Sequence, residues 1–478
     1  MILEICVLSF LLTYAILYLT RFYLTRGKLS RGDTFFHLLL SESIRKNKWK
    51  YPSSLTGVTL SEIDKNNDYL AYPPLFHYLV SLFPMKYYET IAKHFNLVVL
   101  SLMSSIATFF VYGVTNSVFY ALFAVSVLIS NFSILSLVIQ FSPRCLGLFL
   151  YTMIVCVSIF FPLNLFSLLL IAFLVTCLGL THKFAMQVLV FSFIPYILLF
   201  NQPYIILSFA LGFLLLIIVG RGFYIKILKE HIRWLNFYRL RPFRAPLKSY
   251  LTAILGGNVW ILFIILSIFV GLFQNIFFQS PNILLTNLYL KVVFFSLINI
   301  LIAVAVSIPA LSFLGEYSRY VEYSAAPIAI SCSLLTAILN PYFIIASLVF
   351  IFLSLLALSK YKKYLVDSRA IIDSDDVSSY HSLKELNLSN VIVFPARTLE
   401  VNYYSRISVV HPVRGAETPL EQVTHLTENY RLKFVLKFKD SDPYGLFATL
   451  TKMKKMEKVL DFKNFEVYQI NDANSINY

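Results

Sequence analysis

The chain has 478 residues, of which 58% are hydrophobic and only 14% are charged, and its formal net charge is +15. Because a soluble protein carries about 25% charged residues, this composition excludes an ordinary soluble globule and indicates that lipid covers most of the surface. The positive charge favours anionic lipid headgroups or a phosphorylated lipid as a partner. It predicts no nucleic-acid binding, because no recognition motif accompanies it.

Apolar runs long enough to cross a bilayer recur along the chain and predict about eleven transmembrane helices. They lie near residues 2–21, 95–114, 117–139, 144–162, 164–181, 184–200, 204–220, 257–278, 290–314, 324–338 and 341–359. The first run has no preceding basic region and no convincing cleavage site, so it reads as a spanning helix and not as a signal peptide. The predicted fold class is an α-helical polytopic membrane protein.

The segments between these runs differ in charge. The loops after the second, fourth, sixth, eighth and tenth runs contain no Asp, Glu, Lys or Arg. The opposite face receives a long first loop at 22–94, a basic stretch at 221–255, the loop Gly315–Tyr323 and the tail. Charged groups are costly to hold near a bilayer, so their concentration on one face marks the working side.

The tail after the last apolar run has the pattern of a soluble domain. Asn390–Phe394 and Ile407–Val410 predict buried strands, and Leu420–Tyr430 predicts a helix. We expect a transmembrane domain over 1–365, which includes the first loop, and a small C-terminal α/β soluble domain over 366–478.

The first loop carries polar residues at suggestive spacings. Asp33 and His37 stand four residues apart, so on a helix they would share one face. Further along, Tyr72-Pro73-Pro74 leads to His77. Asp33 taken alone also fits a helix N-cap, and that alternative stays open.

The run Arg31-Gly32-Asp33-Thr34-Phe35-Phe36-His37 after the first membrane helix, followed by Tyr72-Pro73-Pro74 and His77, resembles the GT-C glycosyltransferases. This superfamily includes oligosaccharyltransferase catalytic subunits and protein mannosyltransferases, which use sugars carried on a polyprenyl phosphate or diphosphate. The resemblance covers the layout of the whole chain: one helix, a large loop, a helical bundle and a soluble tail. It implies that the large loop lies outside the cytoplasm and carries an acidic residue needed for transfer, here Asp33.

The resemblance implies an enzyme that moves a sugar from a polyprenyl-phosphate or diphosphate carrier to a glycan, protein or lipid acceptor. Asp33 would be the base or acceptor-orienting carboxylate, and His37, Tyr72 and His77 would shape the sugar or acceptor pocket. The chain has no Trp-Trp-Asp run of the kind found in oligosaccharyltransferases, so the acceptor stays open.

Six further residues of the working face are predicted to bind substrate: Arg144, His182, Lys183, Glu316, Arg319 and Tyr320. The cations at the ends of apolar runs would hold the donor phosphate, where Arg offers paired donors and Lys a point charge. Snorkelling to the membrane surface is the alternative for these cations. For the residues of the loop Gly315–Tyr323, the alternative is a structural ion pair.

The basic stretch interleaves cations with aromatic residues, which suits an amphipathic helix at the membrane surface, either as a headgroup anchor or as a substrate contact. The acids Asp373, Asp375 and Asp376 resemble a metal-binding run but also fit a solvated turn. The residues assign no metal ligands, and a divalent cation stays an open cofactor.

The positive-inside rule would place the cation-rich working face in the cytoplasm. We expect this face and the C-terminal domain to be extracytoplasmic, because a phosphate-lipid substrate gives the cations another purpose. A transporter or flippase of lipid-linked glycans is an alternative function, and a non-catalytic membrane subunit is another. A transporter would hold polar residues at the bilayer centre, where Gln140, Asn258 and Asn299 are nearly the only candidates, so an enzyme is favoured.

Overall fold

The computed structural model describes residues 1–31, 33–59, 70, 72–162, 164–240, 283–308, 310–339, 356, 359, 362–363, 370–386, 388, 390–394, 397–410, 432–439 and 446–471. The chain divides into two compact units. The helical unit comprises Met1–Gly27, Tyr72–Phe76 and Thr90–Ser368. The loop–tail unit comprises Lys28–Ala71, His77–Glu89 and Arg369–Tyr478.

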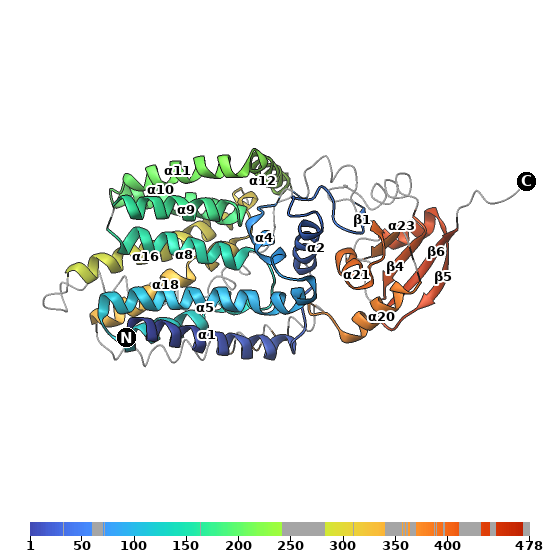
Figure 1. Cartoon of the computed structure of the whole chain (residues 1–478), viewed down its shortest axis with the longest axis horizontal. Helices are drawn as coiled ribbons and strands as arrows, with labels where there is room; N and C mark the ends of the chain where they lie inside the picture. The colour runs from blue at the N-terminus through green and yellow to red at the C-terminus, as the bar shows by residue number, and fades with distance from the viewer. Residues whose placement is uncertain are drawn as a thin grey trace, which may run out of the picture. The chain divides into compact units, whose positions relative to one another are not determined.

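The helical unit is built from helices that are mostly apolar, and most of them run along a common direction (Figure 1). They are α1 (Ile2–Thr25), α5 (Tyr88–Thr115), α6 (Val118–Ser130), α7 (Phe132–Leu137), α8 (Arg144–Phe160), α9 (Leu165–Gly179), α10 (Lys183–Leu199), α11 (Tyr204–Gly220), α12 (Phe223–Leu240), α16 (Ile283–Val306), α17 (Tyr317–Glu322) and α18 (Ala325–Leu339), with a 3-10 turn η2 (Ser312–Leu314). In the described part of the chain, three helices are long and apolar enough to cross a membrane, and the bent pair of α11 and α12 makes a fourth candidate.

Small and hydroxylated residues bring these helices close together. A Cβ added to Gly212 of α11 would lie 2.8 Å from the carbonyl oxygen of Ala172 in α9, so only glycine permits this approach. Between α1 and α5, the buried Ser9 hydroxyl contacts Thr108 at 2.8 Å, and Thr13 donates to Ser104 at 2.8 Å. Such contacts suit helices packed in lipid, where no hydrophobic force between helices operates.

The predicted α-helical polytopic membrane fold is confirmed, and each predicted apolar run that falls on described residues corresponds to helix. The run at 117–139 is divided between α6 and α7 at Asn131, whose side chain accepts a hydrogen bond from the Ser133 amide. The run at 290–314 belongs to a helix that begins earlier, at Ile283, and ends at Val306, shortly before Pro309. The run at 257–278 and nearly all of 341–359 lie outside the described residues, so the number eleven stays a prediction.

The loop–tail unit contains a mixed six-stranded sheet with the order β1-β3-β2-β4-β6-β5. The strands are β1 (Val58–Thr59), β2 (Val391–Phe394), β3 (Val409–Val410), β4 (Phe434–Phe438), β5 (Lys455–Asp461) and β6 (Phe465–Asn471). The pairs from β1 to β4 are parallel, and β6 is antiparallel to both β4 and β5. The accompanying helices are α2 (Asp33–Lys46), α4 (Leu75–Ser81), α20 (Ser374–Lys384), α21 (Thr398–Ser405) and α23 (Leu446–Met453), with a 3-10 turn η1 (Met85–Tyr87). The first two residues of α4 belong to the helical unit.

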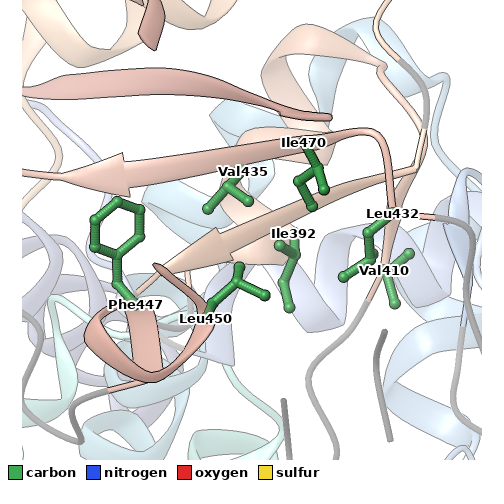
Figure 2. Packing of buried hydrophobic residues seen from close by; sticks show 7 residues of the cluster. All are labelled: Ile392, Val410, Leu432, Val435, Phe447, Leu450 and Ile470. Carbon is green, nitrogen blue, oxygen red and sulfur yellow. The ribbon is translucent and has the colours of Figure 1, made fainter. Parts of the chain in front are cut away.

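One core cluster of the loop–tail unit lies between the strands and α23. Figure 2 shows its seven side chains converging from both: Ile392, Val410, Leu432, Val435, Phe447, Leu450 and Ile470. In β4 the successive residues Val435 and Leu436 are both buried, so both faces of the strand are covered, and Val435 lies in this cluster. The strands predicted at Asn390–Phe394 and Ile407–Val410 are found as β2 and β3, whereas the helix predicted at Leu420–Tyr430 lies outside the described residues.

Most of the first loop forms this unit together with the tail. Strand β1 comes from the first loop and pairs with β3 of the tail. Nearby, the Arg31 amide donates to the carbonyl oxygen of Ala370 at 2.8 Å, and Ser30 forms an antiparallel bridge with Ile371. The predicted boundary places the whole first loop in the membrane domain. The compact units instead group Lys28–Ala71 and His77–Glu89 of this loop with the tail. A two-residue strand such as β1 is too short to carry a sequence periodicity, so its pairing with the tail could not be predicted.

Candidate functional site

Asp33 is the first residue of α2, and its side chain is exposed. The eleven residues that follow it, Thr34 to Ile44, are all buried. A carboxylate at a helix N-terminus is stabilised by the helix dipole. Asp33 therefore presents an exposed carboxylate at the start of a helix whose next eleven residues are enclosed.

A buried ion cluster holds the segment just before Asp33. The Arg31 guanidinium pairs with the Asp376 carboxylate, and its Nε lies 3.8 Å from the Glu400 carboxylate. The side chains of Asp376 and Glu400 are each 3% exposed. Asn464 donates to Asp376 at 2.8 Å, and Tyr380 donates to Glu400 at 2.8 Å. Burial raises the pKa of Glu400, and the charge of Arg31 opposes that rise.

The acidic run of the tail therefore has three separate ion-pair partners. Asp373 precedes α20 and pairs with Lys28 at 3.2 Å, and Asp375 pairs with Lys463 at 2.5 Å. Asp376 is the buried partner of Arg31. Among the residues that the structure describes, no three His, Cys, Asp or Glu side chains are grouped so that they could hold a metal ion.

His37 and His77 come together within the loop–tail unit. The Nδ1 atom of His37 lies 2.9 Å from the Nε2 atom of His77, and the side chains are 2% and 0% exposed. Burial lowers the pKa of His37 to about 3. A neutral imidazole can donate from one nitrogen and accept at the other, so this pair can share one hydrogen bond without charge. Tyr72, the third predicted pocket residue of the first loop, belongs to the helical unit.

Arg144 is the first residue of α8 and forms an ion pair with Glu322, at the end of α17. Its Nη1 donates to Oε1 of Glu322 at 3.1 Å. The other oxygen of Glu322 is buried and has no hydrogen-bond partner among the described residues. Burial raises the pKa of Glu322, and the guanidinium groups of Arg144 and Arg319 counter this effect. Arg319 itself pairs with Glu316 at 2.9 Å.

Lys183 and His182 stand at the start of α10. Lys183 pairs with the buried Glu230 of α12 at 2.6 Å. His182 is the N-cap of α10, because its Nδ1 accepts from the Ala185 amide at 3.3 Å, and the Tyr323 hydroxyl lies 3.5 Å from the same atom. The imidazole of His182 therefore caps a helix and also contacts the residue next to Glu322.

Tyr320 and Gln187 join the same part of the helical unit. The Tyr320 hydroxyl accepts from Nε2 of Gln187 at 2.6 Å and donates to the carbonyl oxygen of Leu314 at 3.0 Å. Nε2 of His231, on α12, lies 3.0 Å from Oε1 of Gln187. Within the helical unit, the predicted residues at the starts of α8 and α10 therefore contact the segment around α17 or lie beside residues that do. Asp33, His37 and His77 belong to the other unit.

Sequence reasoning missed the carboxylates that pair with the predicted cations. Glu322 lies inside the loop Gly315–Tyr323, two residues from Tyr320, but was not chosen. Glu230 is the only Asp or Glu in the basic stretch 221–255. This isolation is the feature of the sequence that could have identified it as the partner of a cation. An isolated acid among many cations has a high chance of being a buried partner, because a buried charge is stable only when it is paired.

The chain is similar to structures of ArnT from Cupriavidus metallidurans. ArnT in the apo state matches with a TM-score of 0.62 at 9% identity, over 97% of this chain and 97% of that chain. ArnT bound to undecaprenyl phosphate matches with a TM-score of 0.58 at 10% identity, over 97% of this chain and 98% of that chain. An archaeal oligosaccharyltransferase, AglB from Archaeoglobus fulgidus in complex with an inhibitory peptide and a dolichol-phosphate, reaches 0.46 at 13% identity, over 92% and 70% of the two chains. No family model matches the sequence, and no curated protein matches it.

The ArnT matches extend over nearly the full length of both chains and therefore establish the fold. The chain therefore has the fold seen in ArnT, and the fold predicted from the first loop and the chain layout is confirmed at the level of fold alone. With its apolar helices, the chain is an integral membrane protein.

Proposed function

We propose that the chain is a membrane glycosyltransferase that moves a sugar from a polyprenyl-phosphate or diphosphate carrier to a glycan, protein or lipid acceptor. The observation that carries this proposal is the match, over nearly all of both chains, to ArnT bound to undecaprenyl phosphate. A shared fold alone does not define an activity. The exposed carboxylate of Asp33 in the first loop supplies the chemical group that the proposed reaction needs.

In the proposed reaction, an acceptor hydroxyl or amide attacks the anomeric carbon of the sugar. The bond between that carbon and the carrier phosphate oxygen breaks, and the polyprenyl phosphate or diphosphate leaves with the bonding electrons. Asp33 would accept the acceptor proton, or orient the acceptor through a hydrogen bond. A carboxylate in this role contributes about 100-fold to 10,000-fold to a rate.

Arg144, Lys183 and Arg319 would stabilise the negative charge that grows on the leaving phosphate. Each of them is paired with a carboxylate in the described structure. A donor phosphate would therefore exchange with, or add to, the carboxylate that each of these cations already contacts.

The remaining predicted residues would shape the site. His37 and His77 are buried against each other, so they would shape the sugar or acceptor pocket from beneath its surface. Tyr72, His182, Glu316 and Tyr320 would line the donor side in the helical unit.

We also propose that the working face and the loop–tail unit lie outside the cytoplasm. The positive-inside rule would place the cations of this face in the cytoplasm. The proposed substrate is a phosphate-bearing lipid that these cations would bind, so it gives them a purpose on the other side of the membrane. The test is labelling of tail lysines by a membrane-impermeant amine reagent in intact cells. Labelling without lysis requires an extracytoplasmic tail, whereas labelling only after lysis would place the tail in the cytoplasm.

The test of activity is transfer of radiolabel from a panel of polyprenyl-phosphate and polyprenyl-diphosphate sugars in membranes that contain the chain. Asp33→Asn keeps the shape and removes the base, and Asp461→Asn, on the exposed β5, is the matched control. We expect transfer by the wild type and by Asp461→Asn, and a loss of at least about 100-fold with Asp33→Asn. Equal transfer by all three would remove Asp33 from the chemistry.

If the folded, inserted wild type transfers label from no donor in the panel, the transporter and the non-catalytic subunit come forward. Within the described residues, the amide nitrogen of Asn299 donates to the Tyr151 hydroxyl and to the carbonyl oxygen of Phe295, both at about 3 Å. Its amide oxygen is buried and has no hydrogen-bond partner there, so Asn299 is the residue to substitute first if the transporter is tested.

A further inference from the structure

Helix α12 begins where a membrane helix ends and turns sharply away from it. Helix α11 ends at Gly220, and the two helices meet at an angle of 108°. Arg221 and Gly222 make this turn with φ angles of 44° and 77°. The left-handed conformation is easy for glycine and uncommon for arginine, so the turn is a specific feature of the fold. If α11 crosses the bilayer, a helix at nearly a right angle to it runs close to the membrane plane.

The exposed side of α12 carries two adjacent stripes. Ile225, Leu228 and Ile232 are 49%, 46% and 49% exposed. With about 100° of rotation per residue, these three fall within an arc of about 60°. The second stripe consists of cations that fall within an equally narrow neighbouring arc: Lys226, Lys229 and Arg233. The buried Ile227 and Glu230 lie on the opposite side of the helix.

The buried side attaches α12 to the bundle. Glu230 pairs with Lys183 at 2.6 Å, and Nε2 of His231 lies 3.0 Å from Oε1 of Gln187. Both partners belong to α10. The orientation of the exposed stripes is therefore set by polar contacts to the bundle, and α12 is not free to rotate its apolar residues inward.

We propose that α12 docks on the surface of the bilayer and binds anionic phospholipid headgroups. The apolar stripe would enter the boundary between headgroups and acyl chains, and the basic stripe would contact the lipid phosphates. Both stripes begin within six residues of the end of α11, so if α11 crosses the bilayer they lie at its surface. Each cation near an anionic surface strengthens binding about fivefold. The occupant is therefore the anionic lipid surface itself.

The first experiment measures amide hydrogen exchange of the full chain in nanodiscs of phosphatidylcholine, with and without about one third phosphatidylglycerol. We expect the amides of residues 223–233 to exchange about tenfold more slowly when phosphatidylglycerol is present. High salt should remove the difference, because it screens exposed charges. If the wild-type amides of residues 223–233 exchange equally fast with and without phosphatidylglycerol, the proposal is wrong, and no variant is needed to show it.

Two triple variants separate the two stripes. The first variant removes the basic stripe and combines Lys226→Gln, Lys229→Gln and Arg233→Gln. It should abolish only the additional protection that phosphatidylglycerol gives. The second variant removes the apolar stripe and combines Ile225→Gln, Leu228→Gln and Ile232→Gln, and it should speed exchange in both lipids. The control is a triple variant with the same charge change at exposed lysines of the loop–tail unit, Lys384→Gln, Lys433→Gln and Lys452→Gln. If the control loses the additional protection as well, the effect belongs to net charge and the proposal fails.

A last arm distinguishes a lipid surface from a soluble phosphate. Glycerol 3-phosphate is added at millimolar concentration to phosphatidylcholine nanodiscs, and we expect no protection of residues 223–233. Protection equal to that given by phosphatidylglycerol would show a site for a soluble phosphate ester and would overturn docking on the bilayer. None of these readouts depends on glycosyl transfer.

Discussion

The buried carboxylates of the two units differ in how their oxygens are occupied. In the loop–tail unit, Asp376 and Glu400 share the guanidinium of Arg31, and the second oxygen of each accepts from a neighbouring amide or hydroxyl. In the helical unit, Glu322 reaches Arg144 through one oxygen, and the other has no partner among the described residues. The first arrangement satisfies its carboxylates and suits a fixed structure. The second joins the two side chains by a single hydrogen bond, so fewer contacts hold this ion pair in place.

The largest expected effect comes from breaking the first arrangement. Asp376→Asn would leave the Arg31 charge buried beside only one remaining carboxylate, and loss of one partner from a buried ion pair costs about 3–5 kcal/mol. We expect the loop–tail unit of the full chain to unfold at markedly lower denaturant concentration, measured by protection of β2 and β4 amides from exchange. Because Arg31 stands two residues before Asp33, activity should fall together with this protection. Unchanged protection would show that the cluster contributes nothing to the fold.

The second prediction tests whether the Arg144–Glu322 pair serves the substrate. Arg144→Gln should reduce kcat/KM for the donor about 100-fold, the usual loss for one group that stabilises developing charge. It also leaves Glu322 buried without its partner, so lost stability could imitate lost catalysis. The matched control is the double variant Arg144→Gln with Glu322→Gln, which removes both charges. Recovery of stability without recovery of transfer supports a substrate role, whereas recovery of both shows a purely structural ion pair.

Sequence reasoning found what depends on composition and on short spacings. The apolar runs predicted the membrane fold. The short motif around Asp33, together with the layout of the chain, predicted the fold that the ArnT comparison supports. It could not find pairings between distant parts of the chain. Arg31 and Asp376 are 345 residues apart, and Arg144 and Glu322 are 178 apart. Neither pair has a local pattern, since a residue's partner across the fold leaves no periodicity in the sequence.

The acidic run illustrates the same limit. Asp373, Asp375 and Asp376 are equal as letters, and their spacing alone suggests either a metal site or a solvated turn. In the structure one is buried and the other two form exposed pairs, because α20 turns only Asp376 inward. Burial decides which carboxylate matters, and the helix orientation that sets burial depends on packing against the rest of the unit.

The third prediction concerns pH and the His37–His77 pair. The pKa of His37 is lowered to about 3 by burial, from an ordinary value of 6.5. Between these values the unfolded chain binds more protons than the folded chain, so stability is fully present above pH 6.5 and declines as the pH falls. The slope is at most about 1.4 kcal/mol per pH unit for this one group. Denaturation of the loop–tail unit at pH 7, 6 and 5 should show the decline, and His37→Gln should flatten it. An unchanged slope in the variant would assign the acid sensitivity to other groups.

The smallest expected effect is that of Asp375→Asn, the neighbour of the most sensitive position. The Asp375 and Lys463 side chains are 45% and 73% exposed, so water already solvates both charges and salt screens their attraction. We expect no measurable change in the unfolding midpoint, in either low or high salt, under conditions in which Asp376→Asn unfolds the unit. The two substitutions make the same chemical change at adjacent residues of one helix. A comparable loss from both would mean that the acidic run acts as a unit, as a metal-binding run would, and added divalent cation should then stabilise the wild type and neither variant. A loss from Asp376→Asn alone assigns the stability to the buried pair with Arg31.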